Sequence, residues 1–502
     1  MIIFYIIITV LFFTASVFIS IYSLEQFYLF LSSTKKRPVL PPILPLTVFP
    51  QVTIQLAIYN ERFVVKNLID CILRLDYPAE KLEIQLLDDS TDETTKIIQS
   101  ILQERTDEKF RIIHIHRSNR EGYKAGALKN GLKTANGEFI AMFDADFRPQ
   151  PDFLLKTLPS FADQKIAAVQ TRWGHINEDQ SLITKVQGIL INNHFLVEQK
   201  GRYDGDMLLQ FSGTGGVWRK KAIEEAGGWR ADTIVEDVDL SFRAQLAGWK
   251  IKLLSDVVCP AELPADINAL KVQQFRWMQG GAEVCRLHLM NIWKSDLNFK
   301  QKFHASLHLT TVYIYFSIFL SAILSLPMLY AIPALKLNPI WLGILSMGLL
   351  LIVIVLFLPN YQTGWIHLSK KQRINRFILL FPSIVVSGLA ISFHNSVAIW
   401  KGAFSLSTPF HRTPKFNAGD RKKLSGTVPT SYRIKASWIA WVELILVFYF
   451  TLALFLGISS KNYVFVVYHF VLILVFATIS FLSLGLNQRG AKNGIANEDF
   501  SQ

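Results

Sequence analysis

Two pairs of acidic residues stand directly after apolar runs, where their carboxylates could do chemistry. Asp88 and Asp89 follow one run, and Asp144 and Asp146 follow another with one alanine between them. Two carboxylates that flank one small residue suit a hard divalent cation, because they hold it while leaving positions for the oxygens of a diphosphate. Asp also favours the turns that end strands, so either pair by itself has a structural explanation.

A lysine and a second acidic group lie further along the chain. Lys124 stands before a helical pattern and could contact the same diphosphate, although a solvated lysine at a helix start explains it as simply. Glu236 and Asp237 precede an amphipathic run. There they could cap a helix, or Asp237 could serve as the base that takes the proton of an acceptor hydroxyl.

Gln273, Arg276 and Trp277 are spaced three and four residues apart along an expected helix. The guanidinium could bind a pyrophosphate, and the aromatic plane could stack on an acceptor sugar. In isolation the same pattern is an amphipathic helix turn that buries a tryptophan.

The elements that must position these residues read as an α/β sheet with helices on its faces. Short apolar runs alternate with helical patterns between residues 51 and 170, which is typical of that fold class. Ligands of such sheets bind beyond the carboxyl ends of the strands, where both acidic pairs stand. The expected strands are Val52–Ile58, Glu83–Leu87, Arg111–His116, Phe139–Phe143 and Ile166–Gln170.

The composition indicates a soluble domain joined to membrane segments. Of 502 residues, 51% are hydrophobic and 18% charged, which is too apolar for a soluble enzyme and too charged for a pure membrane bundle. Much of the net charge of +13 flanks apolar stretches, so it indicates membrane topology, and no nucleic-acid partner is expected. The spacing of the three cysteines predicts neither a disulfide framework nor a zinc site. These are Cys71, Cys259 and Cys285.

Five stretches are expected to span the membrane. Met1–Leu24 has no charged residue and is followed by basic residues, which favours an uncleaved anchor with its N-terminus outside over a cleaved signal peptide. The other expected spans are 307–332, 340–358, 437–458 and 463–486.

A sixth apolar stretch, 377–400, is expected to lie in the membrane interface. Basic clusters stand on both sides of it, at 370–376 and 401–435, and both favour the cytoplasm. A spanning helix would put one cluster outside. With this stretch interfacial, residues 33–305 and the C-terminus are predicted to be cytoplasmic.

With these motifs in order, the chain resembles the processive type of family 2 glycosyltransferases, and most closely the cellulose synthase-like enzymes that make mannan or glucan backbones. The resemblance implies a glycosyltransferase-A-type, Rossmann-like domain between transmembrane helices. The motifs are AspAspSer at 88–90, AspAlaAsp at 144–146, GlnThrArgTrp at 170–173, GlyThrGlyGlyValTrpArg at 213–219, ValGluAspValAspLeu at 235–240 and GlnGlnPheArgTrp at 273–277.

The resemblance also implies a role for each candidate residue. Asp237 is the expected general base, and the expected metal ligands are Asp144 and Asp146, which would hold a divalent cation, Mg or Mn. The nucleotide sugar is expected to contact Asp88, Asp89, Lys124, Asp144, Gln273 and Arg276, and the acceptor Gly213, Thr214 and Trp277.

PheHisArgThrProLys at 410–415 is similar to the gating loop of such synthases, with Phe410, Thr413 and Lys415 as its expected functional residues. Arg412 departs from the pattern, because cellulose synthases usually have an aliphatic residue there. The alternative explanation is that this loop is basic only because loops on the cytoplasmic side of a membrane carry an excess of Lys and Arg.

These expectations divide the chain into six regions. They are an anchor at 1–32, the glycosyltransferase domain at 33–305, a hairpin at 306–360, the interfacial helix with the gating-like loop at 361–435, a hairpin at 436–488 and a tail at 489–502.

The expected function is inverting transfer of a hexose from a nucleotide sugar to a growing β-glycan at the membrane, processive and coupled to export. If the source is bacterial, the expected location is the inner membrane. The sequence leaves UDP-glucose and GDP-mannose open as donors. One alternative is transfer of a single sugar to a lipid carrier or membrane lipid, and another is a transporter or receptor whose acidic residues are structural.

Overall fold

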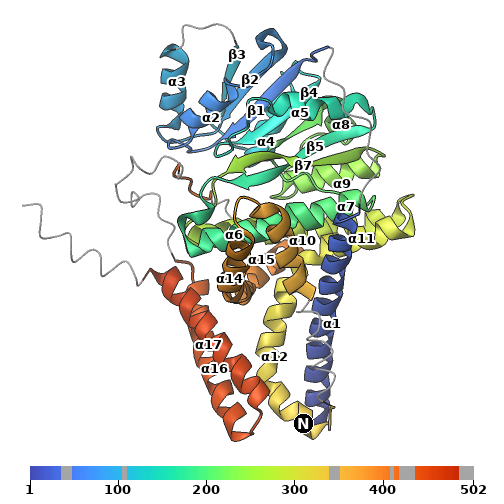
Figure 1. Cartoon of the computed structure of the whole chain (residues 1–502), viewed down its shortest axis with the longest axis vertical. Coiled ribbons are helices and arrows are strands. Elements are labelled where there is room, and N and C mark those ends of the chain that lie inside the picture. Colours follow the sequence, from blue (N-terminus) through green and yellow to red (C-terminus); the bar gives the residue numbers. More distant parts are fainter. Residues whose placement is uncertain (36–47, 105–109, 339–350, 407–411, 418–435, 486–502) are drawn as a thin grey trace, which may run out of the picture.

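The computed structural model describes residues 1–35, 48–104, 110–338, 351–406, 412–417 and 436–485. Its upper part in Figure 1 is an α/β domain around one sheet of seven strands, in the order β3-β2-β1-β4-β6-β5-β7. All neighbours are parallel except β6, which runs antiparallel to β4 and β5. The strands are β1 (Val52–Ile58), β2 (Leu82–Asp88), β3 (Arg111–His116), β4 (Phe139–Asp144), β5 (Ile166–His175), β6 (Gly216–Arg219) and β7 (Lys250–Ala261).

Helices cover both faces of the sheet, because the strands are buried on both sides and must be shielded from water. One buried apolar cluster joins β1 and β2 to α2 (Val65–Ile72), α3 (Thr94–Glu104) and α5 (Phe153–Thr157). A second cluster packs α4 (Tyr123–Leu132), α8 (Lys220–Glu225) and α9 (Glu236–Leu246) against the other face. Short 3₁₀ turns also belong to this domain, at Ala79–Lys81, Leu158–Ala162 and Glu178–Gln180.

The α/β fold predicted from the sequence is confirmed, and all five expected strands are present. β6 and β7 were not predicted. β6 is only four residues long and follows a glycine-rich turn, so it carries no periodic signal of its own. β7 pairs with β5 through two irregularities in register, which break the alternation that a strand pattern needs.

Long apolar helices form the lower part of the molecule. In Figure 1, α1 (Ile2–Ser33) and α12 (Ile314–Ala334) descend side by side, and α16 (Ile439–Ser459) descends beside α17 (Tyr463–Leu484). Apolar side chains of α12, α16 and α17 meet in one buried cluster, and α1 joins α12 in another. A side chain that faces another helix and a side chain that faces lipid are both favoured when apolar. This explains why these helices are apolar on every face.

Within the part of the chain that the structure describes, five helices are long and apolar enough to cross a membrane, which marks the chain as an integral membrane protein. Four of them match expected spans: α1, α16, α17 and the apolar run Phe299–Ala334. The fifth is α14 (Lys370–Ala390), where we expected an interfacial segment. The expected span 340–358 lies partly outside the described residues, and its described end belongs to the shorter apolar helix Leu351–Gly364.

Between the sheet and the descending helices lies a layer of crosswise elements. In Figure 1, α14 and α15 (Ser392–Ala403) are at the level of α6 (Leu182–Asn193) and α10 (Ile267–Lys294), above the lower ends of α12 and α17. The interfacial position of 377–400 stays a prediction. The other elements of this layer are a π-helical turn (His194–Gln199), α7 (Lys200–Asp204), α11 (Phe299–Thr310), a 3₁₀ turn (Thr311–Tyr313) and a second π-helical turn (Asn360–Gly364).

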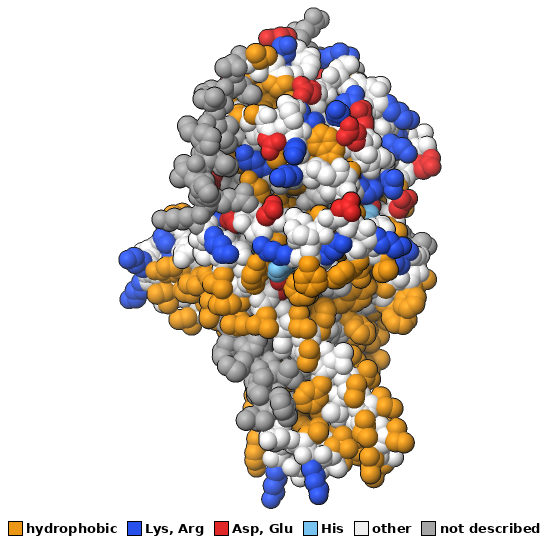
Figure 2. Space-filling model, turned by 90° about the vertical axis from the view of Figure 1, so that its right-hand side faces the viewer, with side chains coloured by type: hydrophobic (Ala, Val, Ile, Leu, Met, Phe, Trp, Pro, Cys, Tyr) orange, Lys and Arg blue, Asp and Glu red, His pale blue; other side chains and the backbone are white. Residues whose placement is uncertain are grey.

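One face of the molecule carries a band of apolar side chains below a row of Lys and Arg side chains, as Figure 2 shows. Basic side chains near a membrane surface contact the headgroups, and apolar ones below them contact the hydrocarbon. This band therefore fits the height at which a bilayer would begin.

Candidate active site

The AspAlaAsp acids lie at the carboxyl end of β4, beside β1, where the strand order changes direction. That crevice is where open α/β sheets bind ligands. Lys124 Nζ lies 2.6 Å from Asp144 Oδ1 and donates to the Gly213 carbonyl at 3.0 Å. Burial opposes the charged form of Asp144, but the neighbouring cations Lys124, Lys415 and Arg276 together outweigh it and lower the pKa of Asp144. Asp144 is therefore held as a carboxylate.

The second acid, Asp146, is buried and forms an ion pair with Lys415. Lys415 belongs to residues 412–417, a segment without regular secondary structure that lies over the site. In the same segment, the Thr413 hydroxyl accepts a hydrogen bond from Arg276 Nη2 at 3.2 Å. The structure thus brings two of the three gating-loop candidates to the acids, and Phe410 lies outside the described residues.

Asp237 lies in the first turn of α9, close to Lys124 and Gly213. An ideal Cβ on Gly213 would stand 2.9 Å from Asp237 Oδ2, and the φ of Gly213 is +78°, which a side chain would strain. Burial and then the neighbouring Glu236 carboxylate raise the pKa of Asp237 to about 7, although Lys124 opposes them. A carboxyl group with that pKa is suited to accept a proton near neutral pH.

Thr214 connects the turn before β6 to the acids. Its hydroxyl accepts a hydrogen bond from the Asp144 backbone N–H at 2.8 Å, and its carbonyl accepts one from Gln170 Nε2 at 3.2 Å. Trp173 Nε1 donates to the same carbonyl at 3.4 Å. Gly213 and Thr214, the expected acceptor contacts, therefore lie between Asp144 and Asp237.

Asp88 lies at the end of β2, and protein partners hold its carboxylate. The Ser90 N–H donates to it at 2.9 Å and the Thr95 hydroxyl at 2.7 Å, and His114 Nε2 lies 3.0 Å away. Burial opposes ionisation, but the hydrogen bonds from His114, Ser90 and Thr95 outweigh it and lower the pKa of Asp88 to about 2. Nucleotide contact by Asp88 stays a prediction; in this structure its side chain joins the loop after β2 to α3 and β3.

Asp89 binds Arg117 through both carboxylate oxygens, with N–O distances of 2.8 and 2.6 Å. Arg117 also donates to the carbonyls of Glu121 and Tyr123 at the start of α4. Asp89 thereby holds Arg117 against the turn that brings Lys124 to the site. Contact between Asp89 and the nucleotide stays a prediction, as it does for Asp88.

The third group of candidates lies on α10, which begins where the Asp266 side chain caps it by accepting from the N–H groups of Asn268 and Ala269. Gln273, Arg276 and Trp277 are half-buried on this helix. Burial lowers the pKa of Arg276, while Asp144 raises it, so the guanidinium lies within electrostatic reach of the acids. The Gln273 carbonyl oxygen is buried and has no hydrogen-bond partner among the described residues, so one acceptor on this helix is left unsatisfied.

Sequence reasoning missed several residues around the site. Glu61 follows β1 and pairs with Arg412, and the Arg120 guanidinium lies 3.3 Å from the centroid of the Tyr59 ring, also after β1. The position of Tyr59 and Glu61 at the end of a strand beside the crevice could have singled them out. Their partners could not have been found, because Arg412 lies 351 residues away.

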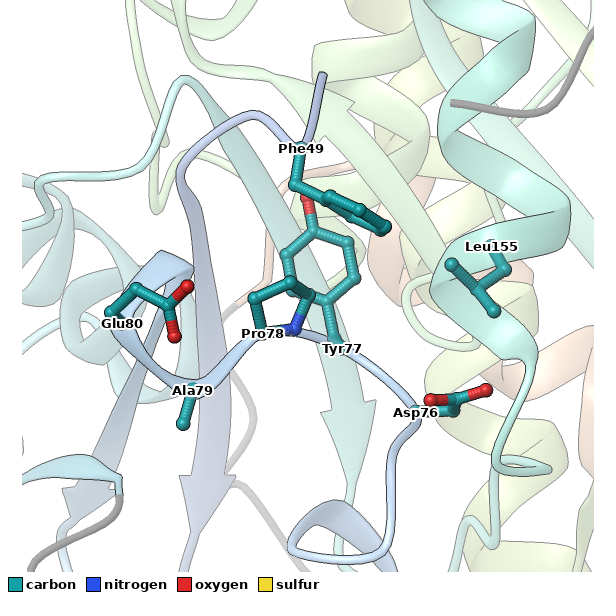
Figure 3. A pocket seen from close by; sticks show the side chains of 7 residues that line it. All are labelled: Phe49, Asp76, Tyr77, Pro78, Ala79, Glu80 and Leu155. Carbon is teal, nitrogen blue, oxygen red and sulfur yellow. The ribbon is translucent and has the colours of Figure 1, made fainter. Parts of the chain in front are cut away.

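A hollow of about 730 Å³ lies elsewhere, at the amino ends of β1 and β2 (Figure 3). Phe49 and Tyr77 form its wall with ring centroids 5.4 Å apart, and Glu80 stands at its side. The acidic residues follow the carboxyl ends of the strands, so this hollow is not part of the candidate site.

Asp144 and Asp146 provide carboxylate oxygens, the ligand type that Mg²⁺ and Mn²⁺ accept. Among the described residues, no group of three or more His, Cys, Asp or Glu side chains could hold a metal ion by itself.

Residues 50–280 match the family model described as "Glycosyltransferase like family 2". The family predicted from the motifs is therefore confirmed for this part of the chain. Two curated plant relatives match the chain. One is glucomannan 4-beta-mannosyltransferase 1 of Oryza sativa subsp. japonica, which is 44% identical over 256 residues. The other is glucomannan 4-beta-mannosyltransferase 2 of Arabidopsis thaliana, which is 43% identical over 249 residues. These matches cover 50% and 49% of this chain, and 49% and 47% of the relatives. The chain spans about half the length of the curated relatives it matches.

A solved structure shares the fold. It is a mannosyltransferase from Pyrobaculum calidifontis in complex with GDP-Man and Mn²⁺, with a TM-score of 0.51 and 20% sequence identity. The match covers 80% of this chain and 99% of that one, and it supports the glycosyltransferase-A-type arrangement of the sheet.

Proposed function

We propose that this chain, whose residues 50–280 form a family 2 glycosyltransferase domain, transfers a hexose from a nucleotide sugar to the growing end of a β-glycan. The observation that carries the proposal is the position of Asp237 next to Lys124 and Gly213, with Asp144 on the other side of Lys124. In this position Asp237 could act as the base, beside the acids that would bind the cation of a diphosphate.

In the proposed reaction, Asp237 takes the proton of the acceptor hydroxyl while the hydroxyl oxygen attacks the anomeric carbon of the donor. The bond between that carbon and the diphosphate oxygen breaks, and the nucleoside diphosphate leaves. A single base and in-line displacement invert the anomeric configuration. Trp277 would stack on the acceptor sugar, with Gly213 and Thr214 lining its approach.

The donor diphosphate would lie between cationic side chains and the two acids. Lys124 and Arg276 would contact its oxygens, as would Lys415 and Thr413 of segment 412–417. Asp144 and Asp146 would hold a divalent cation, Mg²⁺ or Mn²⁺, which when bound neutralises the charge that develops on the leaving group. Gln273 would add a hydrogen bond. Asp88 and Asp89 would shape the nucleoside side of the crevice.

We favour mannose from GDP-mannose as the donor sugar. The curated relatives are named 4-beta-mannosyltransferases, and the solved structure with the same fold contains GDP-Man. A β-1,4-linked mannan or glucomannan is accordingly the proposed product. We propose a cytoplasmic catalytic domain, since nucleotide sugars are made there and the basic clusters favour that side.

Processive synthesis with export is the final part of the proposal, because glycan hydroxyls need hydrogen-bond partners while crossing lipid. Aromatic side chains suit such a path, because sugar faces stack on rings. By its position in the sequence near the membrane segments Trp365 is one candidate, but its side chain does not face such a path. It is fully buried and donates to Glu178 at 3.2 Å. Trp400, Trp438 and Trp441 are exposed, which suits the membrane interface equally well.

The test is a donor panel with the purified full chain in lipid vesicles and a β-1,4-manno-oligosaccharide acceptor. GDP-mannose should give polymer that an endo-mannanase degrades, and UDP-glucose and GDP-glucose should give less. Asp237→Asn should abolish transfer while nucleotide binding, measured by calorimetry, persists. Product that partitions into organic solvent as a single-sugar lipid would replace this proposal with the lipid glycosyltransferase. Absence of turnover with every donor would overturn enzymatic function.

A further inference from the structure

Glu61 and Arg412 form a two-pronged ion pair between the loop after β1 and segment 412–417. Arg412 Nε donates to Glu61 Oε1 at 2.8 Å, and Arg412 Nη2 donates to Oε2. The exposed fractions of the two side chains are 14% for Arg412 and 8% for Glu61. Bidentate geometry and low exposure separate this pair from ordinary surface ion pairs, which are solvated and weak.

The pair is one of several contacts that seat the segment. The Phe416 backbone N–H donates to Glu262 Oε1 at 3.0 Å, and Arg148 donates to the Asn417 side chain. The rings of Phe63 and Phe416 are 6.0 Å apart. Phe63 stands in the same loop as Glu61, so the loop after β1 contacts the segment through both charge and aromatic packing.

These contacts fix the positions of Thr413 and Lys415, the two residues of the segment that reach the site. Three residues after Arg412, Lys415 pairs with Asp146, and Thr413 accepts from Arg276 between them. Neither Glu61 nor Arg412 belongs to the pairs that would touch the donor. Both act on the site through the segment.

We propose that Glu61 and Arg412 are positioning residues that hold segment 412–417 over Asp144 and Asp146 before any donor binds. Arg412 stands where the cellulose synthases that the chain resembles usually have an aliphatic residue, and such a residue could not bind a carboxylate. In this chain the segment therefore has an anchor that is independent of the nucleotide. Only the kinetic consequence rests on the proposed function.

The anchor is tested without activity, by the rate at which a disulfide forms between cysteines in Phe63→Cys/Phe416→Cys, with Cys71, Cys259 and Cys285 replaced by alanine. The disulfide should form without donor or metal, at a rate that is the reference for the variants below. Adding Arg412→Leu should slow it about tenfold, because a carboxylate is left without its partner. The exchange Glu61→Arg/Arg412→Glu should restore the rate. Lys66→Leu, which removes an exposed lysine of α2 that pairs with Asp70, is the control and should have no effect.

Two results would overturn the proposal. One is that Phe63→Cys/Phe416→Cys, the parent protein of this test, forms its disulfide only when GDP-mannose and Mn²⁺ are present. The other is an Arg412→Leu rate equal to that of the parent. If Arg412→Leu does not fold, the Glu61→Arg/Arg412→Glu exchange decides the question alone. Slow disulfide formation in a folded exchange variant also contradicts the anchor.

Kinetics then separate positioning from a general structural role. Arg412→Leu should raise the donor KM about tenfold with the acceptor KM unchanged, because fewer molecules hold the segment in place when donor arrives. A variant that merely loses folded protein shows a lower kcat with both KM values unchanged. The charge exchange should recover the donor KM. Complete inactivity with all donors would count against the proposed function and leave the disulfide result standing.

Discussion

Each of the two acids after β4 carries a lysine partner: Asp144 pairs with Lys124 and Asp146 with Lys415. The acid pair is thus neutralised within the protein. A divalent cation must displace or push aside at least one ammonium group to bind there, because like charges repel strongly at such short range. Lys415 is the one that can turn aside, because its long side chain stands on a segment without regular secondary structure and can swing from Asp146 toward a diphosphate while the segment stays in place.

We predict that Lys415→Met strengthens Mn²⁺ binding in the absence of donor. Removing one positive charge within a few ångströms of the site should lower the dissociation constant about tenfold. Electron paramagnetic resonance titration of free Mn²⁺ measures it. Lys156→Met, which removes an exposed lysine that pairs with Asp152, is the matched control and should bind as the parent does. Equal affinities for all three proteins would contradict competition between Lys415 and the cation.

The pKa of Asp237 predicts the pH dependence of activity. Burial and Glu236 raise it from its ordinary value to about 7, and a general base works only when deprotonated. The kcat/KM for acceptor should therefore fall as pH is lowered through about 7, tenfold per pH unit below it. A profile of kcat/KM from pH 5 to 9 tests this. If kcat/KM instead falls only near pH 4, either another group accepts the proton or Asp237 is not shielded from water.

Strand-end position singled out Asp144 and Asp146 in the sequence, and the motif ahead of the α9 pattern singled out Asp237, because the types and spacing of these residues carry the chemistry. Glu61 also follows a strand beside the crevice, so its position could have marked it as a candidate. Its contact could not be predicted, because Arg412 lies 351 residues away along the chain. Pairings of that kind arise from tertiary packing alone.

At the scale of elements, the turn before β6 sets the distance between Asp237 and Asp144. Gly213 takes a φ of +78° and leaves no room for a side chain next to Asp237. Gly248, with φ +91°, is its matched control, since nothing lies within 4 Å of an added Cβ there. Both alanine variants should have similar backbone strain, and they differ only in crowding at the base.

We predict that Gly213→Ala lowers kcat at least a hundredfold, because displacement of a reacting group by about 1 Å costs that much. Gly248→Ala should keep nearly full kcat, while thermal unfolding shows similar destabilisation for both. Initial rates with saturating donor and acceptor measure the difference. Equal losses of activity in the two variants would mean that strain, not crowding at Asp237, explains the glycine.

A buried ion pair joins α10 to the last membrane hairpin. Lys271 Nζ donates to both oxygens of Glu443 in α16 at 2.8 and 2.7 Å, and to the Ser483 hydroxyl of α17 at 2.8 Å. From the sequence, Glu443 could have reached water near the helix end or lined a polar path. In the structure it is fully buried against Lys271, two residues before Gln273.

We predict that Glu443→Leu destabilises the protein by about 3–5 kcal/mol, since it leaves the Lys271 ammonium buried without its partner. The double variant Lys271→Met/Glu443→Leu should recover most of that loss, because an apolar pair of similar volume fills the same space. Thermal unfolding in detergent gives the comparison. A double variant as unstable as the single one would show that the site is polar for another reason, such as bound water.

The elements that the sequence predicted well are those with strong periodicity or long apolar runs: the first five strands and the helices α1, α16 and α17. Around 340–400 prediction was weaker, because length and apolar composition do not separate a helix that spans from one that lies in the interface. α14 meets both criteria for a span and yet starts with basic residues. Its orientation depends on packing, which composition does not encode.

At the scale of the whole molecule, the topology is open to a direct test. In a cysteine-free background, Lys371→Cys and Arg421→Cys should both be protected from an impermeant thiol reagent in intact cells, since both basic clusters favour the cytoplasm. Permeabilised cells provide the control, where both should react. Labelling of one position in intact cells would mean that α14 and α15 together cross the bilayer.

The distance along the chain between Glu61 and Arg412 has a consequence for biosynthesis. With 351 residues between them, and translation at about 5–20 residues per second, Arg412 is made roughly 20–70 s after Glu61. Throughout that interval the nascent domain can fold around its sheet but lacks the segment that lies over the acids. The emerging enzyme should therefore be idle toward its donor until most of its membrane helices have been synthesised, so that sugar transfer begins only on a chain already committed to the bilayer.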